Sequence, residues 1–208
     1  VFHADIRALS QARLLVGGTE PEGLVGTADG PGRVTFVGVA RELGDPGTDP
    51  TVRVTRRRQV VADGMDEEIE LGSTATGPVQ VDVRLEAGSD LAGMPAVRRG
   101  TAVPTVPPSQ AGDGLAWRAS DDAGAVRVRL TGDRARVDSD RAALTWPVVV
   151  PPRATVVVRW RLRVDDPGRV VVPPTGAPPW ASPHVEADDR RLPALLHRSL
   201  HDLDTLRL

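Results

Sequence analysis

The sequence contains no cysteine and no tyrosine, and aromatic residues make up only 3% of its 208 positions. Without cysteine the chain can form neither a disulfide nor a thiolate metal or redox site. Lysine and asparagine are also missing, so all 26 basic residues are arginine and there is no acceptor for N-glycosylation. With so few aromatics, the 40% of apolar residues must build a core that consists mainly of Val, Leu and Ala.

Charge and apolar runs exclude two classes of partner. The 28 acidic residues nearly balance the basic ones and give a net charge of −2. Because such a surface does not attract a phosphate backbone, we expect no nucleic-acid partner. No stretch approaches the roughly 20 apolar residues of a membrane helix, so we expect no membrane partner either. Together with the missing cysteine, this pattern fits a cytoplasmic location.

Residues 51–85 carry the clearest structural signal. They predict three consecutive antiparallel strands, with a tight turn at residues 62–64 because Asp-Gly supplies the positive φ of a hairpin. In the third strand apolar and polar residues alternate strictly. Its apolar face consists of Val79, Val81, Val83 and Leu85. Such alternation gives a strand one wet and one buried face, which is typical of a sandwich and not of a parallel α/β sheet.

Further strands follow at regular spacing along the chain. Residues 8–16 read as an early strand, and residues 155–164 as the last one, with Val, Leu and Trp160 on one face and arginines on the other. The Pro-rich segment up to Gly114 marks an edge or a surface loop, since proline cannot donate to a central ladder. The predicted fold class is therefore all-β, a two-layer antiparallel β-sandwich that occupies residues 1–166.

The pattern changes after residue 166. Residues 167–187 are rich in proline and predict an extended connector. Residues 188–208 have helical period and predict a C-terminal amphipathic linker helix with a leucine stripe. The stripe consists of Leu192, Leu196, Leu203 and Leu206. A lone helix must bury such a stripe against a partner, so we expect it to lead into a further domain that follows residue 208.

Two patterns could mark a metal site or a catalytic site, but the sequence favours solvent-exposed side chains in both. His197 and His201 lie four apart, a spacing that can hold zinc. Both fall opposite the leucine stripe and no third ligand is apparent, so no metal site is predicted. Acidic clusters at residues 66–68, 121–122 and 165–166 flank expected turns, so we interpret them as solvated charge and predict no catalytic residue.

Clustered arginines and the tryptophans also allow a binding role and a structural one. Arginines at residues 56–58 could form an anion patch, but a strand splits them between two faces, and pairing with the acidic residues 66–70 across the hairpin is the plainer interpretation. Trp117 and Trp180 could stack on sugars. An apolar aromatic usually packs, however, so we expect Trp160 in the core and Trp180 against a neighbouring domain.

Four segments carry a resemblance to one protein family. Residues 2–10, FHADIRALS, resemble an opening F-x-x-D-x-R-x-L-S, and residues 57–64, RRQVVADG, resemble an R-R-x-V-x-x-G hairpin with one more residue before the glycine. Residues 89–98, SDLAGMPAVR, resemble A-D-F-A-D-L-F-E-V-R without its second Asp and both Phe positions. Residues 192–208 resemble a linker helix R-S-x-x-D-L-x-x-L, through Arg198, Ser199, Asp202, Leu203 and Leu206. Together they are similar to the N-terminal domain of bacterial and archaeal glycogen debranching enzymes of the amylo-α-1,6-glucosidase type.

The resemblance implies a β-sandwich of the supersandwich kind that precedes an (α/α)6 toroid, which in that family holds the catalytic carboxylates. This chain would then be a non-catalytic domain without a cofactor, whose partner is its own C-terminal toroid and which could shape the entrance for an α-glucan. His3, Asp5 and Arg7 are expected to face that interface. A rival interpretation makes Asp5 and Arg7 a structural ion pair at the edge of a sheet.

Two other functions stay open from the sequence. A stand-alone carbohydrate-binding module would need exposed aromatic platforms. A purely structural interaction sandwich would have no role towards a glycan at all. A toroid of helical hairpins in the residues after Leu208 would favour the debranching-enzyme interpretation over both.

Overall fold

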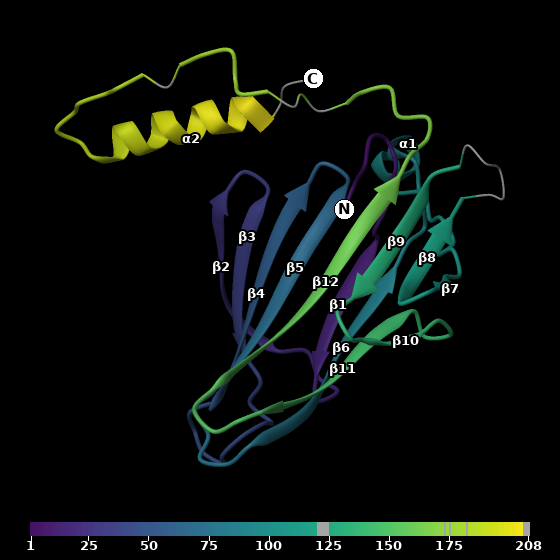
Figure 1. Ribbon diagram of the computed structural model, residues 1–208, viewed down its shortest axis with the longest axis vertical. Coiled ribbons are helices and arrows are strands. Elements are labelled where there is room, and N and C mark those ends of the chain that lie inside the picture. Colours follow the sequence, from purple (N-terminus) through teal and green to yellow (C-terminus); the bar gives the residue numbers. More distant parts are fainter. Residues whose placement is uncertain (120–124, 173, 175, 182, 206–208) are drawn as a thin grey trace.

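The computed structural model describes residues 1–119, 125–172, 174, 176–181 and 183–205. In these residues the chain forms two antiparallel sheets that pack face to face, and a C-terminal helix follows them (Figure 1). The small sheet has four strands in the order β1-β6-β11-β10, and the large sheet has eight in the order β2-β3-β4-β5-β12-β9-β8-β7. The predicted all-β, two-layer antiparallel sandwich is therefore confirmed.

The elements have the following bounds. The strands of the small sheet are β1 (Gln11–Val16), β6 (Val79–Gly88), β10 (Arg136–Asp138) and β11 (Ala143–Val150). Those of the large sheet are β2 (Glu22–Gly30), β3 (Arg33–Val39), β4 (Val52–Val61), β5 (Gly64–Ser73), β7 (Ser109–Ala111), β8 (Gly114–Arg118), β9 (Arg127–Gly132) and β12 (Thr155–Asp165). The helices are α1 (Met94–Arg98) and α2 (Arg191–Thr205).

The stretch at residues 51–85 forms β4, β5 and β6, but the third strand does not continue the sheet of the first two. β4 and β5 make the predicted hairpin, whereas β6 pairs with β1 and β11 in the small sheet. The three predicted strands are present, but the last one belongs to the other sheet. The loop between Ser73 and Val79 carries the chain from the large sheet to the small one. There β6 buries its apolar face against the large sheet.

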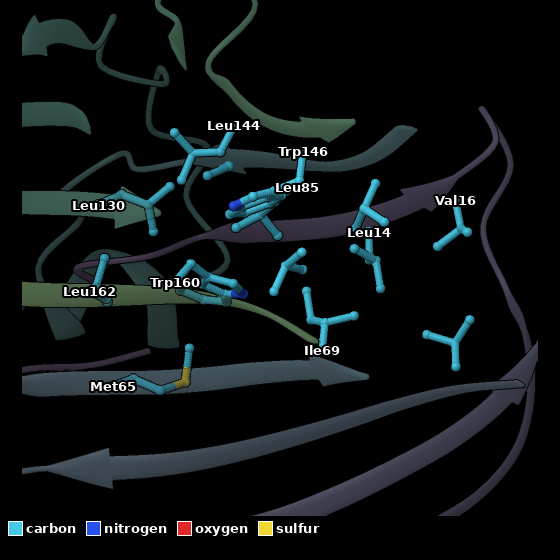
Figure 2. Close-up of a cluster of buried hydrophobic side chains, with 14 of the residues drawn as sticks. Leu14, Val16, Met65, Ile69, Leu85, Leu130, Leu144, Trp146, Trp160 and Leu162 are labelled. Atoms are coloured by element: carbon cyan, nitrogen blue, oxygen red, sulfur yellow. The ribbon is translucent and has the colours of Figure 1, made fainter. Parts of the chain in front are cut away.

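The core lies between the two sheets and is built from the predicted alternating positions (Figure 2). β5 contributes Ile69 and β6 contributes Leu85, and both side chains are fully buried. Trp160 is in the core as predicted, and Trp117 is completely buried as well, so Trp117 cannot serve as a sugar platform. Because burying one large apolar side chain contributes about 1.5–3 kcal/mol, this layer dominates the stability of the fold.

The large sheet extends past the small one on the side of β2 and β3. No residue of β2 is buried, and in β3 only Gly38 and Val39 are. We call these two uncovered strands the overhang. Its inner face, the one directed towards the small sheet, carries Phe36, which pairs across the strands with Gly26 and with Arg56.

A buried ion triad lies where the overhang meets the core. Glu67 on β5 has no exposed side-chain surface, and its carboxylate oxygens accept hydrogen bonds of 2.5 Å from Nε of Arg56 and Nε of Arg58 on β4. Arg58 is the direct partner of Glu67 in the strand register, so the triad specifies this alignment of β4 and β5. Arg58 also lies over the ring of Phe36, 5.5 Å from its centroid.

Arg57 points to the opposite, outer face and pairs there with other acids of β5. Its Nη1 lies 3.4 Å from Glu68 and 2.9 Å from Glu70, and Arg159 on β12 reaches Glu68 at 2.8 Å. The predicted split of the three arginines and their pairing across the hairpin are therefore confirmed. These outer pairs are partly exposed, so each contributes little to stability.

After β12 the chain leaves the sheets, and α2 lies beyond one end of the sandwich (Figure 1). The helix begins at Arg191 rather than at residue 188. Asp189 accepts a hydrogen bond of 2.9 Å from the N–H of Arg191, which satisfies a free donor of the first turn. Neither described helix has the length and apolar character needed to cross a bilayer.

The leucine stripe of α2 is not covered by the sandwich. No described residue of the helix is buried, and Leu192 and Leu203 are 50% and 54% exposed. Leu196 is partly exposed, and Leu206 lies outside the described residues. The predicted division into residues 1–166, 167–187 and 188–208 stays a prediction.

Replacing Glu67 with alanine should destabilise the sandwich strongly, because two guanidinium groups would stay largely buried without a counter-charge. We expect a loss of about 3 kcal/mol in the free energy of unfolding, measured by urea denaturation. Glu68→Ala is the matched control, since it removes the neighbouring carboxylate on the outer face, which is 33% exposed. The control should cost less than about 1 kcal/mol, and equal losses in the two variants would contradict a special role of the triad.

Candidate interdomain site

The first nine residues fold against the loop that follows β6. The N–H of Arg7 donates to the carbonyl of Ala92 at 2.9 Å, and the N–H of Met94 donates to the carbonyl of Asp5 at 2.7 Å. These bonds run in both directions between the two stretches, so they hold them as a small antiparallel pair. Two of the four segments singled out in the sequence therefore lie side by side.

Arg7 and Asp90 join these segments through a bidentate ion pair. Nε of Arg7 donates to Oδ1 of Asp90 at 3.1 Å, and Nη2 of Arg7 donates to Oδ2. Asp90 is only 7% exposed and also accepts a hydrogen bond of 3.2 Å from the N–H of Ala92. The hydrogen bond from Arg7 lowers the pKa of Asp90 below its ordinary value; burial opposes this shift, and the Ala92 N–H adds to it.

The rival interpretation, in which Asp5 pairs with Arg7, is wrong. In the described part of the chain Arg7 forms its ion pair with Asp90, and Asp5 is exposed. The nearly buried Asp90 offers both of its oxygens to the guanidinium, whereas a pair with Asp5 would lie in water and gain little.

Two residues of this region have a left-handed backbone although neither is glycine. Ala4 has a φ of 46° and Leu91 a φ of 49°. This conformation costs roughly 1–2 kcal/mol for an L-residue, so it persists only where the surroundings fix it. The Arg7–Asp90 pair and the backbone bonds beside it supply that fixation. The region is therefore a preformed surface and not a loose terminus.

His3 connects this surface to the end of β12. Its Nε2 lies 3.3 Å from Oδ2 of Asp166, and the two side chains are 14% and 15% exposed. Among the residues that the structure describes, His3 Nε2 has no hydrogen-bond partner, so this is a close polar contact between two largely buried groups. The N-terminal segment thus touches the residue at which the chain leaves the sandwich.

A cavity of about 500 Å³ opens at this end of the sandwich. It is lined by parts of the N-terminal segment, the connector and the end of α2, among them His3, Asp5, Asp166, Val170, Val171 and Thr205. Val170 is 93% exposed and Val171 is 50% exposed. Exposed apolar side chains beside charged groups are typical of a surface that another body covers.

The structure brings some of the predicted interface residues together and leaves others apart. His3 and Asp5 line the cavity, and Arg7 forms the neighbouring pair with Asp90. Trp180, half-buried in the connector, is not among the described residues that line the cavity. Sequence reasoning did not single out Asp90. It interpreted the acidic clusters that contain Glu67 and Asp166 as solvated charge, which is wrong for these two residues, because their side chains are 0% and 15% exposed. The only signal for Asp90 was its place in the segment at residues 89–98.

The chemistry of the side chains is that of ion pairs and not of a catalytic centre. Among the described residues, no group of three or more His, Asp or Glu side chains is placed to hold a metal ion. His197 and His201 are exposed on α2, as expected. Asp90, the buried carboxylate of this site, has a lowered pKa, whereas a general acid of glycoside hydrolysis needs a raised one.

Comparison with known protein families gives a match over most of the chain. A family model described as the N-terminal domain of (some) glycogen debranching enzymes matches residues 1–161. The matched range contains the Arg7–Asp90 pair and the strands of both sheets up to most of β12, and it stops before the connector and α2. No curated protein matches the sequence.

Asp90→Asn keeps the shape of the side chain but removes its charge. Because the folded state lowers the pKa of Asp90, the stability contributed by the charge is present at neutral pH and is lost as the pH falls through that lowered pKa. We expect the variant to be about 2 kcal/mol less stable than the wild type at pH 7, with the gap closing below about pH 4. Urea denaturation at a series of pH values measures the stability difference and its dependence on pH.

Asp5→Asn is the matched control for this experiment. Asp5 belongs to the same segment but is exposed, so its variant should follow the wild type closely at every pH. A gap for Asp90→Asn that keeps its size from neutral pH to about pH 2 would show that the charge of Asp90 is not what joins the two segments.

Proposed function

The chain belongs to the family of N-terminal domains of glycogen debranching enzymes, and from this premise we propose that it is a non-catalytic domain of an amylo-α-1,6-glucosidase-like glycoside hydrolase. In this role it braces the (α/α)6 catalytic toroid of its parent protein and shapes the entrance for the α-glucan. The observation that carries the proposal is the family match over residues 1–161, which takes in nearly the whole sandwich.

The geometry of the sandwich end supports the bracing role. Strained residues at Ala4 and Leu91, a buried ion pair and reciprocal backbone bonds make a rigid surface there. The strained backbone conformations cost free energy, and an unconstrained surface loop would not retain them. A toroid that docks on this end would cover the exposed Val170 and Val171 and the rim carboxylate of Asp5.

The exposed leucine stripe of α2 supports the same role. Leu192, Leu195 and Leu203 are each at least half exposed, which is unusual for three leucines of one short helix. In the proposed parent protein this helix packs its stripe against the first helices of the toroid. The helix thereby connects the two domains by side-chain packing as well as by the covalent chain.

Two further parts of the proposal concern activity and location. The hydrolysis of α-1,6 linkages belongs to carboxylates of the toroid, since the two buried carboxylates described here, Glu67 and Asp90, are each bound by arginine. We place the protein in the cytoplasm, which the absence of cysteine fits. A stand-alone carbohydrate-binding module with tryptophan platforms is disfavoured because Trp117, Trp146 and Trp160 are buried.

The purified 208-residue chain should release no glucose from a glycogen limit dextrin or from maltooligosaccharides. The reason is that the two buried carboxylates of the described residues, Glu67 and Asp90, are each paired with arginine, whereas glycoside hydrolysis needs one carboxyl group as acid and another as nucleophile or base. An enzymatic assay for free glucose measures this, with an active debranching enzyme as the positive control. Glucose release by the wild type that disappears in an Asp166→Asn or Asp5→Asn variant would contradict the proposal.

A further inference from the structure

A second cleft, of about 210 Å³, lies between the edge strand β1 and the overhang. β1 forms one wall, β3 and β4 form the other, and the turn between β1 and β2 closes the cleft at one side. Its described lining residues are all different from those of the interdomain cavity. Because strands and a tight turn build it, the cleft is preformed and does not depend on the position of α2.

Phe36 supplies an aromatic wall. Its ring packs on Gly26, where a Cβ atom would lie 3.2 Å from Cδ1 of the phenylalanine. Covering a glycine of a neighbouring strand is a structural role for an aromatic residue. That role does not use the whole ring, because Phe36 remains 39% exposed and lines the cleft. Arg58 lies over the ring 5.5 Å from its centroid, so only the part of the ring that Gly26 and Arg58 leave exposed offers a platform to the apolar C–H face of a sugar ring.

The floor of the cleft is bare backbone. Gly23 of β2 and Gly38 of β3 face each other across the strands, and both line the cleft. A Cβ atom at Gly38 would lie 2.6 Å from the carbonyl oxygen of Glu22, so no larger residue fits there. A Cβ atom at Gly23 would meet nothing within 4 Å, so open space lies above it. A ring can therefore lie on the backbone at Gly23, whereas the carbonyl of Glu22 bounds the cleft at Gly38.

The rim is polar and already balanced in charge. Arg13 pairs through Nε with Oε1 of Glu20, and the two side chains are 49% and 57% exposed. Arg56, which also lines the cleft, is bound to Glu67. Because these guanidinium groups have carboxylate partners, the cleft suits a neutral ligand with hydroxyl groups better than an ion. Neighbouring donors and acceptors on Arg13 and Glu20 match a pair of adjacent hydroxyls.

We propose that this cleft binds one glucose unit of an α-glucan chain, with Phe36 against the apolar face of the ring and with Arg13 and Glu20 hydrogen-bonded to its hydroxyls. The cleft is smaller than the roughly 300 Å³ of the smallest drug-sized sites, so it holds a single ring and not a longer segment. The choice of an α-glucan rests on the proposed function, whereas the cleft itself lies apart from the proposed domain interface.

The experiment uses the full 208-residue chain and maltoheptaose as the probe. Isothermal titration calorimetry gives the dissociation constant, and amide chemical shifts in NMR spectra give the place of binding. Gly23→Leu is the most direct variant, since its side chain has room and would fill the cleft. Gly47→Leu is the matched control, because it also has no atom within 4 Å of a Cβ but does not line the cleft. Phe36→Ala and Arg13→Ala test the wall and the rim.

The wild type and Gly47→Leu should bind maltoheptaose with equal, saturable affinity, and shifts should concentrate on β1, β3 and the turn after β1. Gly23→Leu and Phe36→Ala should weaken binding at least tenfold, and Arg13→Ala should weaken it several-fold, with thermal unfolding of each variant recorded beside it. No saturable binding by the wild type, or full binding by Gly23→Leu, overturns the site. Glucose release in the same samples would instead overturn the non-catalytic role, so the two failures are distinguishable.

Discussion

The alternation of aliphatic and polar residues along the strands is the constraint on which the whole structure depends, because it can be satisfied only by burying one face of each sheet against the other. The two sheets are unequal, with four and eight strands, so the buried layer ends while the large sheet continues. The change is visible within β4, whose inner-facing positions pass from Val52 and Val54 to Arg56 and Arg58. Glu67 lies at this boundary and neutralises the arginines where the core gives way to water.

The two surfaces of functional interest follow from this mismatch and from the way in which the chain closes the sandwich. The overhang leaves Phe36 beside bare glycine backbone and so creates a small polar-rimmed cleft. At one end, the Arg7–Asp90 pair ties the N-terminal segment to the loop after β6, and His3 reaches the residue at which the connector begins. The surface at the sandwich end is rigid and carries apolar side chains on its connector side, whereas the cleft is built from strands and the turn between β1 and β2. We therefore propose a different ligand for each, a sugar ring for the cleft and a protein domain for the sandwich end.

Much of the fold could be predicted from the sequence, since period-two patterns, the Asp-Gly turn and the pairing of residues 56–58 with acids are local signals. The transfer of β6 to the other sheet could not be, because both layers bury the same aliphatic pattern and nothing local distinguishes them. For the candidate site, His3 and Asp5 were named through a family resemblance, but the partner of Arg7 was missed. Asp90 lies 83 residues away in the chain, and such a contact depends on the tertiary fold. The exposure of Phe36 could not be predicted either, because the local sequence does not show that β3 extends beyond the small sheet.

The central claim is that the end of the sandwich with the Arg7–Asp90 pair is the face on which the catalytic domain docks. Hydrogen exchange of backbone amides tests it most directly, by comparison of the 208-residue chain with the same residues in a protein that carries an attached (α/α)6 domain. The account predicts that amides of residues 3–7, of the connector from residue 168 to 172 and of α2 exchange more slowly in the longer protein, while β2 and β3 stay unchanged. Slower exchange confined to β2 and β3, or no change at the sandwich end, would contradict it.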